Sequence, residues 1–171
     1  MKRGIRKPLI VMSPKSLLRH KRAQSTLDEL TAGGFMPIIP DVGGVPASAV
    51  SKVLLCSGRV YYDLEQERET RGANDVHIVR LEQLYPLDAS LLTQVLSAYR
   101  PGTRLVWVQD EPWNLGAWYF IKARLQALFG DGLPLQCVAR AESASPATGS
   151  AAAHRTEQRE LMNAAFAPPR S

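Results

Sequence analysis

The chain has 171 residues, of which 45% are hydrophobic and 22% are charged, and its formal net charge is +5. No apolar run approaches the roughly 18 residues that a membrane-spanning helix needs, so the composition excludes a membrane protein and predicts a globular one. The two cysteines, Cys56 and Cys137, stand far apart and outside any CxxC or Cys/His cluster. We therefore expect neither a disulfide scaffold nor a zinc site, and we expect a reducing compartment.

The positive charge is concentrated at the amino terminus. Up to Arg22 there are eight Lys and Arg residues and no acids, whereas the rest of the chain has 13 Lys and Arg against 16 Asp and Glu. This basic segment holds no aromatic residue, although nucleic-acid binders usually interleave aromatics with their cations. We expect a solvated or partner-facing basic edge and no binding of nucleic acid. The segment also lacks the long apolar stretch of a signal peptide, which favours a bacterial cytoplasmic protein, with the mitochondrial matrix as the alternative.

Apolar runs and turn residues predict alternating strands and helices. Strands are expected, the second of them short, at Pro8–Met12, Met36–Ile39, Lys52–Cys56, Val76–Leu81, Arg104–Gln109 and Leu135–Ala139. Helices are expected after Ser13-Pro14, from Ser57-Gly58 to Gly72, after the cap Asp88, from Asp110-Glu111-Pro112 to Gly130, and at Thr156–Phe166. This alternation predicts an α/β fold, with a mostly parallel sheet covered by helices on both faces. We expect one domain, with a basic lead-in at 1–7, a globular part at 8–166 and a frayed tail at 167–171.

Motifs that usually mark a catalytic or cofactor site are missing from the sequence. It contains no GxGxxG, no GxxxxGK[ST] and no GxSxG. The histidines His20, His77 and His154 are scattered, and none has a carboxylate at the spacing of a relay or a metal pair. Gly130-Asp131-Gly132 resembles the start of the metal–diphosphate motif of thiamin enzymes, but the Asn pair that completes it is absent, so a helix C-cap at Gly130 is the better interpretation. We predict no catalytic, cofactor-binding or metal-binding residue in this chain.

The most informative stretch is Gln109–Trp118, QDEPWNLGAW. If the strand before it is parallel, Asp110-Glu111 falls at the carboxyl end, where open α/β sheets place ligands and partners. The alternative is that both acids favour a helix N-terminus electrostatically, while Gly116 permits close packing. Helix capping does not require the two tryptophans Trp113 and Trp118, so a protein–protein interface at this stretch stays a hypothesis. We assign Trp118 to the core and Trp113 to the interface.

Five segments carry a resemblance to a known family. They are SPKSLLRH at 13–20, SGRVYYDL at 57–64, IVRLEQLYPL at 78–87, QDEPWNLGAW at 109–118 and SASPATG at 143–149. In order and spacing they are similar to the C-terminal domain of the thiamin-diphosphate-dependent decarboxylating component of the 2-oxoglutarate dehydrogenase complex. The family usually has Gln-Glu-Glu-Pro where this chain has Gln-Asp-Glu-Pro at 109–112, a change that keeps both charges. The resemblance implies a transketolase C-terminal-like fold, with three α/β/α layers and a mixed five-stranded sheet that has one antiparallel edge strand.

The resemblance also implies a role inside a much larger enzyme of the tricarboxylic acid cycle. That enzyme decarboxylates 2-oxoglutarate, or its adipate homologue, and transfers the acyl group to a lipoyl arm. In the family, thiamin diphosphate and Mg²⁺ are held by the two preceding domains, so this segment is expected to bind no cofactor and to be inactive alone. Its implied partners are the preceding domains, a homodimer partner and the lipoyl-bearing succinyltransferase. Met1 directly before the domain fits either an excised segment or a split gene.

Two functions stay open: a structural and interface domain, or a regulatory ligand- or partner-binding module of a related 2-oxo acid dehydrogenase. One branch of the family binds acetyl-CoA through a Lys, a Ser, a Gln and two Arg. Carried over to this sequence, these positions fall on Gly34, Pro37, Gln83, Ser90 and Leu91. Only the glutamine matches, and a neutral amide does not replace three cations, so we expect no acetyl-CoA site. The candidate interface or regulatory residues are Gln83, Gln109, Asp110, Glu111, Trp113 and Asn114.

Overall fold

The computed structural model describes the chain except for residues 1–3, 5–6, 44, 131–133 and 169–171. The chain divides into two compact units, Met1–Gly33 and Gly34–Ser171. We call the first unit the arm and the second the core domain. Among the described residues, no helix combines the length and the apolar character that crossing a membrane requires. The expected single globular part at 8–166 stays a prediction.

The arm has short helices and little packing. It contains the 3₁₀ helices η1 (Lys15–Arg19) and η2 (Lys21–Ala23) and the α-helix α1 (Leu27–Ala32), and none of the three has a buried residue. A capping box begins α1, in which the Thr26 hydroxyl accepts from the Glu29 amide at 3.2 Å and the Glu29 carboxylate accepts from the Thr26 amide at 2.7 Å. Local capping therefore stabilises α1 without help from a core.

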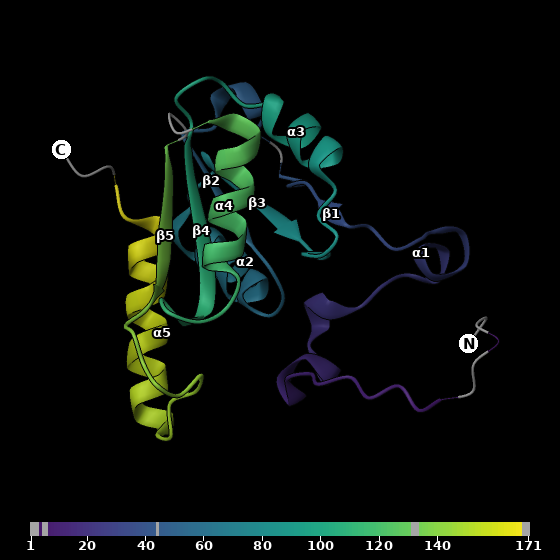
Figure 1. Ribbon diagram of the computed structural model, residues 1–171, viewed down its shortest axis with the longest axis vertical. Helices are drawn as coiled ribbons and strands as arrows, with labels where there is room; N and C mark the ends of the chain where they lie inside the picture. Colours follow the sequence, from purple (N-terminus) through teal and green to yellow (C-terminus); the bar gives the residue numbers. More distant parts are fainter. Residues whose placement is uncertain (1–3, 5–6, 44, 131–133, 169–171) are drawn as a thin grey trace. The chain divides into compact units, whose positions relative to one another are not determined.

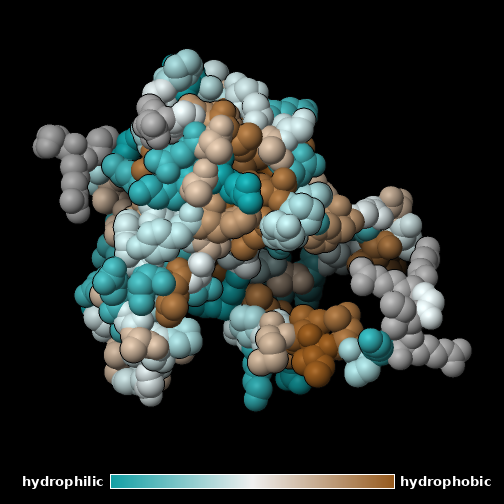
Figure 2. Space-filling model, in the orientation of Figure 1, coloured by the Kyte–Doolittle hydropathy of each residue, from teal (hydrophilic) through white to brown (hydrophobic). Residues whose placement is uncertain are grey.

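The predicted strand at Pro8–Met12 is wrong. These residues form no strand, and Leu9 and Met12 are 87% and 92% exposed. An apolar run indicates a segment that favours burial, but it does not supply a neighbouring strand to pair with, and Pro8 lacks a backbone donor. The helix expected after Ser13-Pro14 is the 3₁₀ helix η1, whose N-cap Pro14 provides no side-chain cap. Figure 2 shows apolar side chains gathered on the surface of this unit.

The core domain is built on a five-stranded sheet in the order β1-β3-β2-β4-β5 (Figure 1). The strands are β1 (Ile38–Ile39), β2 (Lys52–Cys56), β3 (Val76–Leu81), β4 (Arg104–Pro112) and β5 (Leu135–Arg140). The β1–β3 pair is antiparallel and the other three pairs are parallel. The bounds of β2 and β3 are those predicted from the sequence, whereas the strand expected at Met36–Ile39 is reduced to two residues.

Helices cover both faces of the sheet. The α-helices of the described core domain are α2 (Val60–Arg71), α3 (Ala89–Ser97), α4 (Trp118–Phe129) and α5 (Ala151–Phe166), and a short 3₁₀ helix, η3, spans Ala47–Ala49. Buried residues of α3 and α4 join one apolar core, and those of α2 and α5 join the other (Figure 1). This arrangement confirms the predicted α/β class with three α/β/α layers and a mixed, mostly parallel sheet.

Successive side chains of the central strands point alternately into the two apolar cores. On β2, Val53 and Leu55 belong to the core shared with α3 and α4, whereas Leu54 and Cys56 belong to the core shared with α2 and α5. All four side chains are fully buried, and complete burial of a large aliphatic side chain stabilises a fold by about 1.5–3 kcal/mol. Burial on both faces explains why the central strands are almost continuous apolar runs in the sequence.

Strand β4 is longer than predicted. Its pairing with β5 resumes after an irregularity, with Pro112 opposite Arg140, so the strand includes Asp110 and Glu111. The hypothesis that these two acids serve the N-terminus of the following helix is therefore wrong, because α4 begins only at Trp118. The acids instead lie at the carboxyl end of a parallel strand.

Helix α5 begins at Ala151, earlier than the predicted start at Thr156. The Ser150 hydroxyl accepts a hydrogen bond from the Ala153 amide at 3.4 Å and caps the helix. Alanine has the highest intrinsic helix propensity, so the alanines at 151–153 extend the helix into a stretch that resembled a linker. As a result, His154 lies within the helix.

Candidate functional site

The carboxyl ends of three parallel strands meet at one edge of the sheet, which we call the carboxyl edge. Arg59 follows β2, Asp110 lies near the end of β4, and Arg140 ends β5. The strand order reverses between β2 and β4, because β3 follows on one side and β5 on the other. Open α/β sheets hold ligands at such a reversal. The carboxyl edge is therefore the candidate functional site.

Arg59 spans the reversal point. Its Nη2 donates to Asp110 Oδ2 at 2.8 Å, and its Nη1 donates to Asp63 Oδ2 at 2.9 Å. Gln158 of α5 donates to the same Asp63 oxygen at 3.0 Å. The crevice in which this sheet topology favours a ligand thus holds an ion pair that links the turn after β2 to β4.

Arg140 is the most enclosed of the three charged residues, with 8% of its side chain exposed. Its Nη1 donates to Glu157 Oε2 at 3.2 Å, and its Nη2 donates to Gln158 Oε1 at 2.9 Å. His154 Nδ1 lies 3.1 Å from the same Nη2. All three partners belong to α5, so the guanidinium fastens that helix to the end of the sheet.

Two buried atoms of the carboxyl edge lack a hydrogen-bond partner among the described residues. They are Asp110 Oδ1, which lies 4.0 Å from Arg140 Nη2, and Arg140 Nε. A cavity of about 590 Å³ lies between the end of β5, the loop at 141–149 and α5, and Glu142, Glu157 and Glu160 contribute to its lining. A cavity of this size with glutamates in its lining has room for ordered water, which commonly satisfies such atoms. The hydrogen-bonding capacity of Asp110 and Arg140 is therefore only partly satisfied by described protein groups.

Gln109 organises the turn after β4. Its Oε1 accepts from Trp107 Nε1 at 2.9 Å and from the Trp118 amide at 3.0 Å, while its Nε2 donates to the carbonyls of Pro112 at 3.0 Å and Leu115 at 2.7 Å. The side chain is buried, with Gln109 only 3% exposed. One amide thus satisfies four groups of the strand, the turn and the next helix, which makes Gln109 a structural residue.

Gly116 allows this arrangement. It has a positive φ of 69°, and a Cβ there would lie 2.9 Å from Gln109 Nε2. A side chain at this position would therefore meet both backbone strain and a clash with the amide. The glycine that the sequence suggested for close packing does provide a close approach, to Gln109.

The remaining residues predicted near β4 have different surroundings. Asn114 pairs with the backbone of Ser143, donating to its carbonyl at 3.0 Å and accepting from its amide at 3.1 Å, and this pair ties the turn to the loop after β5. Trp113 is half-buried, and its ring centroid lies 5.5 Å from that of the buried Trp118. Glu111 is exposed. The assignment of Trp118 to the core is confirmed.

Gln83 does not join this group. It follows β3, and its Nε2 donates to the Pro86 carbonyl at 2.8 Å while its amide donates to the Pro37 carbonyl at 3.0 Å. These contacts shape its own turn. The side chain that matched the regulatory pattern is thus engaged locally, away from Gln109–Asn114.

The two cysteines and His77 are wholly or partly buried side chains. Burial raises the pKa of the Cys56 thiol and raises that of Cys137 to about 12, whereas a reactive cysteine needs a lowered pKa. His77 is buried, with Nδ1 3.1 Å from the Tyr99 hydroxyl and Nε2 3.0 Å from the Val45 carbonyl. These groups act as packed structural side chains.

Within the described ranges, no three His, Cys, Asp or Glu side chains are arranged to hold a metal ion. Gly130 ends α4 with a φ of 78°, as the C-cap interpretation predicted, while Asp131 and Gly132 lie outside the described residues.

Sequence reasoning found Asp110 but missed its partners Arg59 and Arg140. It also missed the residues that bind these two arginines, namely Asp63, Glu157 and Gln158. A usable signal was present, because a charged residue stands at or just after the end of three predicted parallel strands, and such ends converge at one edge. The contacts from α5 had no comparable signal. They join residues up to 95 positions apart, as between Asp63 and Gln158.

The fold and the carboxyl edge together define a class of protein: a three-layer α/β domain whose strand ends are joined by ion pairs and a buried amide. Comparison with known proteins then identifies its family. Residues 24–166 match the family model described as 2-oxoglutarate dehydrogenase C-terminal. The chain belongs to this family, which confirms the resemblance seen in the sequence.

The chain is similar to several curated relatives. It is 47% identical over 167 residues to the 2-oxoglutarate dehydrogenase E1 component of Cupriavidus necator and 44% identical over 167 residues to that of Azotobacter vinelandii. The E1 component of Rickettsia felis is 47% identical over 166 residues. The matches cover 98%, 96% and 94% of this chain but only 18%, 18% and 17% of the relatives. The chain thus spans about one fifth of the length of the curated relatives that it matches.

Proposed function

We propose that this chain is the C-terminal structural and interface domain of a 2-oxoglutarate dehydrogenase E1 component, the oxidoreductase component that decarboxylates 2-oxoglutarate and succinylates a lipoyl arm. The observation that carries the proposal is the match of 98% of the chain, at 47% identity, to a relative of that name. Thiamin diphosphate and Mg²⁺ belong to the complete enzyme in this proposal. The chain itself supplies surface and rigidity.

The geometry of the carboxyl edge supports a structural role. Ion pairs of Arg59 and Arg140 join the strand ends beside the cavity, and Gln109 is fully engaged with backbone and indole groups. Breaking a buried ion pair leaves one charge uncompensated, so these pairs stabilise the arrangement of the strand ends and the helices beside them. The residues nearest to a candidate active site are thus committed to holding the domain together.

The proposed partners are the preceding domains of the same enzyme, a second copy in a homodimer and the lipoyl-bearing succinyltransferase of the complex. Nucleic acid and membrane are not among them. The proposed location is the bacterial cytoplasm, which the bacterial relatives favour over the mitochondrial matrix.

A second candidate function is a regulatory ligand- or partner-binding module. The observation in its favour is the cavity of about 590 Å³ beside the unpartnered Arg140 Nε. The cavity is also lined by three glutamates, so its charge disfavours a polyanion such as acetyl-CoA. Calorimetric titration at low salt tests this candidate, and saturable micromolar binding of acetyl-CoA would favour it over the structural role.

A chimeric enzyme tests the main proposal. The matching segment of the Cupriavidus necator E1 component is replaced by this chain, and transfer of the succinyl group to the lipoyl arm is measured with the rest of the complex. We expect the chimera to keep at least about a tenth of the parent's kcat, because the two segments are 47% identical. A chimera that folds and assembles but is inactive would contradict the proposal, and the unmodified parent enzyme is the control.

A further inference from the structure

The two edges of the sheet differ in their protection. The edge strand β1 has two residues, whereas the edge strand β5 has six and pairs only with β4 among the described strands. Its stretch 135–139, Leu-Gln-Cys-Val-Ala, contains no charge and no proline, the residues that commonly guard an edge. Residues 135–139 of β5 thus form a sheet edge without a charged residue or a proline to prevent further strand pairing.

The hydrogen bonds to β4 show which backbone groups of β5 are free. The Leu105 amide donates to the Pro134 carbonyl at 3.2 Å, and the Trp113 amide donates to the Arg140 carbonyl at 2.9 Å. Alternate residues of a strand turn their backbone groups to the same side, so the even-numbered residues of β5 face β4. The N–H and C=O groups that face outward belong to Leu135, Cys137 and Ala139.

A groove accompanies this edge. A cavity of about 500 Å³ is lined by residues 135–139 of β5, by Trp113 and Trp118, and by Ala164, Ala167 and Pro168. Trp118 is 4% exposed, and its buried Nε1 has no hydrogen-bond partner among the described residues. The unpaired strand edge therefore lies beside an apolar groove.

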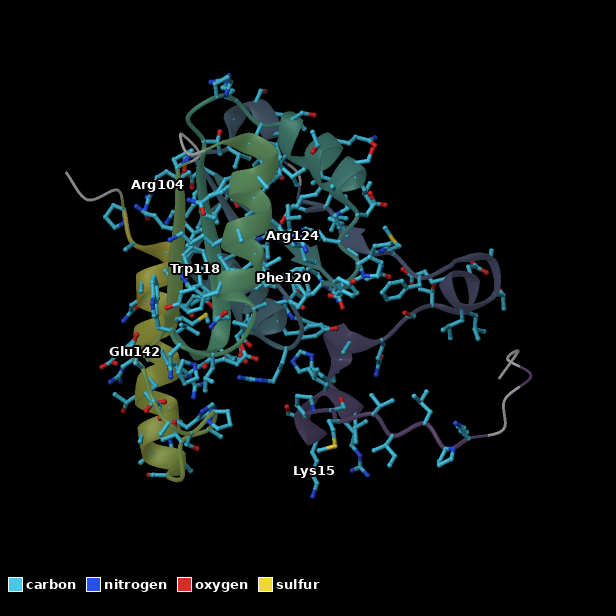
Figure 3. All side chains as sticks on the ribbon, viewed as in Figure 1. Lys15, Arg104, Trp118, Phe120, Arg124 and Glu142 are labelled. Atoms are coloured by element: carbon cyan, nitrogen blue, oxygen red, sulfur yellow. The ribbon has the colours of Figure 1, made fainter. Side chains whose placement is uncertain are left out.

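Opposite charges stand at the two ends of the edge. Figure 3 shows Arg104 near one end of β5 and Glu142 near the other, with Trp118 between them. Arg104 donates to Gln136 Oε1 at 3.2 Å and forms no ion pair within the described part of the chain. Glu142 is exposed and likewise forms no ion pair with a described residue. If β5 of a second copy paired antiparallel with this β5, Arg104 of each copy would lie near Glu142 of the other.

We propose that the β5 strands of two copies of this chain pair antiparallel about a two-fold axis at Cys137, so that the two sheets become one. In this register Leu135 of one copy faces Ala139 of the second, and Arg104 lies at the same end as Glu142 of the second copy. A two-fold interface must be self-complementary, and an uncharged centre with opposite charges at its ends meets that requirement.

This inference rests on the homodimeric part of the proposed function and assigns a surface to it. A proline at the axis tests the pairing directly. Cys137→Pro removes an outward N–H without removing a bond to β4, whereas Cys137→Val keeps it. Losing both symmetry-related hydrogen bonds should raise the dimer dissociation constant by about 30-fold or more in Cys137→Pro, while Cys137→Val stays within about threefold. Sedimentation equilibrium of the 171-residue chain gives both constants, and circular dichroism checks that each variant is folded.

Charge reversal tests the ends of the pair. Arg104→Glu should raise the dissociation constant by about tenfold, because it sets two acids against each other at both ends. The double variant Arg104→Glu, Glu142→Arg should restore the parent value, and Glu142→Arg alone should weaken the dimer as Arg104→Glu does. Restoration by the second reversal distinguishes a direct pair from a general loss of stability.

Three results would overturn the inference. A chain that stays monomeric at millimolar concentration has no such pairing. A dimer that is unaffected by Cys137→Pro and by charge reversal uses another surface, which leaves the homodimer itself intact. Amides at 135–139 that become protected from hydrogen exchange only within the chimeric enzyme would assign the edge to another segment of that enzyme. Activity of the chimera is measured separately, so the enzymatic role and the β5 pairing can fail independently.

Discussion

Two neighbouring residues at the end of β4 solve the problem of a buried polar side chain in different ways. Gln109 faces the core of α3 and α4, is neutral, and its Oε1 and Nε2 both hydrogen-bond to strand, turn and helix. Asp110 faces α2 and α5, is charged, and keeps one oxygen without a hydrogen bond. A saturated neutral amide fixes one geometry, whereas an incompletely saturated ion-pair cluster tolerates change. The two sides of this strand should therefore respond differently to substitution.

The largest effect is expected for Gln109→Ala. Removing the amide leaves Trp107 Nε1, the Trp118 amide and the partly buried Leu115 carbonyl without their partner, whereas the Pro112 carbonyl keeps the Leu115 amide at 2.9 Å. Each unsatisfied buried group costs about 1–3 kcal/mol, and with partial relaxation we expect a total loss of about 3–5 kcal/mol. Urea unfolding monitored by tryptophan fluorescence measures it.

The matched control for this variant is Asn114→Ala. Its two hydrogen bonds to Ser143 are exposed, so the loss should stay below about 1 kcal/mol. If the two alanine variants are equally stable, Gln109 does not have the role that its contacts indicate.

A smaller effect is expected on the charged side. Arg140→Met removes a guanidinium with 8% exposure and leaves Glu157 without its cationic partner, whereas Asp110 keeps its ion pair with Arg59 at 2.8 Å. Breaking a fully buried pair costs about 3–5 kcal/mol, and because Glu157 is 36% exposed we expect about 2 kcal/mol.

The double variant Arg140→Met, Glu157→Gln sharpens this prediction. It removes the charge left without its partner and should recover part of the lost stability, with the coupling read from a double-mutant cycle. A double variant that is less stable than Arg140→Met would show that uncompensated charge is not the cause of the loss.

The smallest effect concerns alkaline pH. Burial raises the pKa of Cys137 from its ordinary value of 9.0 to about 12, and burial with the nearby Asp41 raises that of Tyr99 from 10.0 to about 12. At a pH between its ordinary pKa and its raised pKa, each group loses its proton in the unfolded chain but keeps it in the folded chain. The stability contributed by both groups is therefore complete below pH 9 and declines as the pH rises towards 12. Lys52 acts in the opposite direction, because burial lowers its pKa.

This prediction is tested by measuring the free energy of unfolding against pH for the parent chain and for two variants. The free energy of unfolding of Cys137→Val and Tyr99→Phe should fall less steeply above pH 9 than that of the parent chain. Identical slopes for all three proteins would contradict the assignment of the alkaline loss to these groups.

The sequence predicted the parts of the fold that depend on local patterns. Strands β2 and β3 have the expected bounds because they are continuous apolar runs buried on both faces. The same pattern failed at Pro8–Met12, since an apolar run does not specify a pairing partner. It also failed at Asp110, where the end of β4 is set by pairing with Arg140 rather than by the residues of β4 themselves.

The candidate site was predicted only in part, for a related reason. Gln109, Trp113 and Asn114 stand close together in the sequence and also lie together in the structure, so a local motif was enough to find them. Their roles were not visible, because the four bonds of Gln109 depend on where the turn places its carbonyls. Arg59 and Arg140 act through contacts that cross the sheet, and these follow from topology rather than from spacing.

One assay tests the central claim most directly, which is that this domain supplies structure and interface rather than chemistry. The purified chain is incubated with 2-oxoglutarate, thiamin diphosphate and Mg²⁺, and release of carbon dioxide is followed alongside a complete E1 component as the positive control. We predict a folded chain with no release above the protein-free background. Catalytic release of carbon dioxide by the chain, abolished by substitutions at the carboxyl edge such as Asp110→Asn, would contradict the claim.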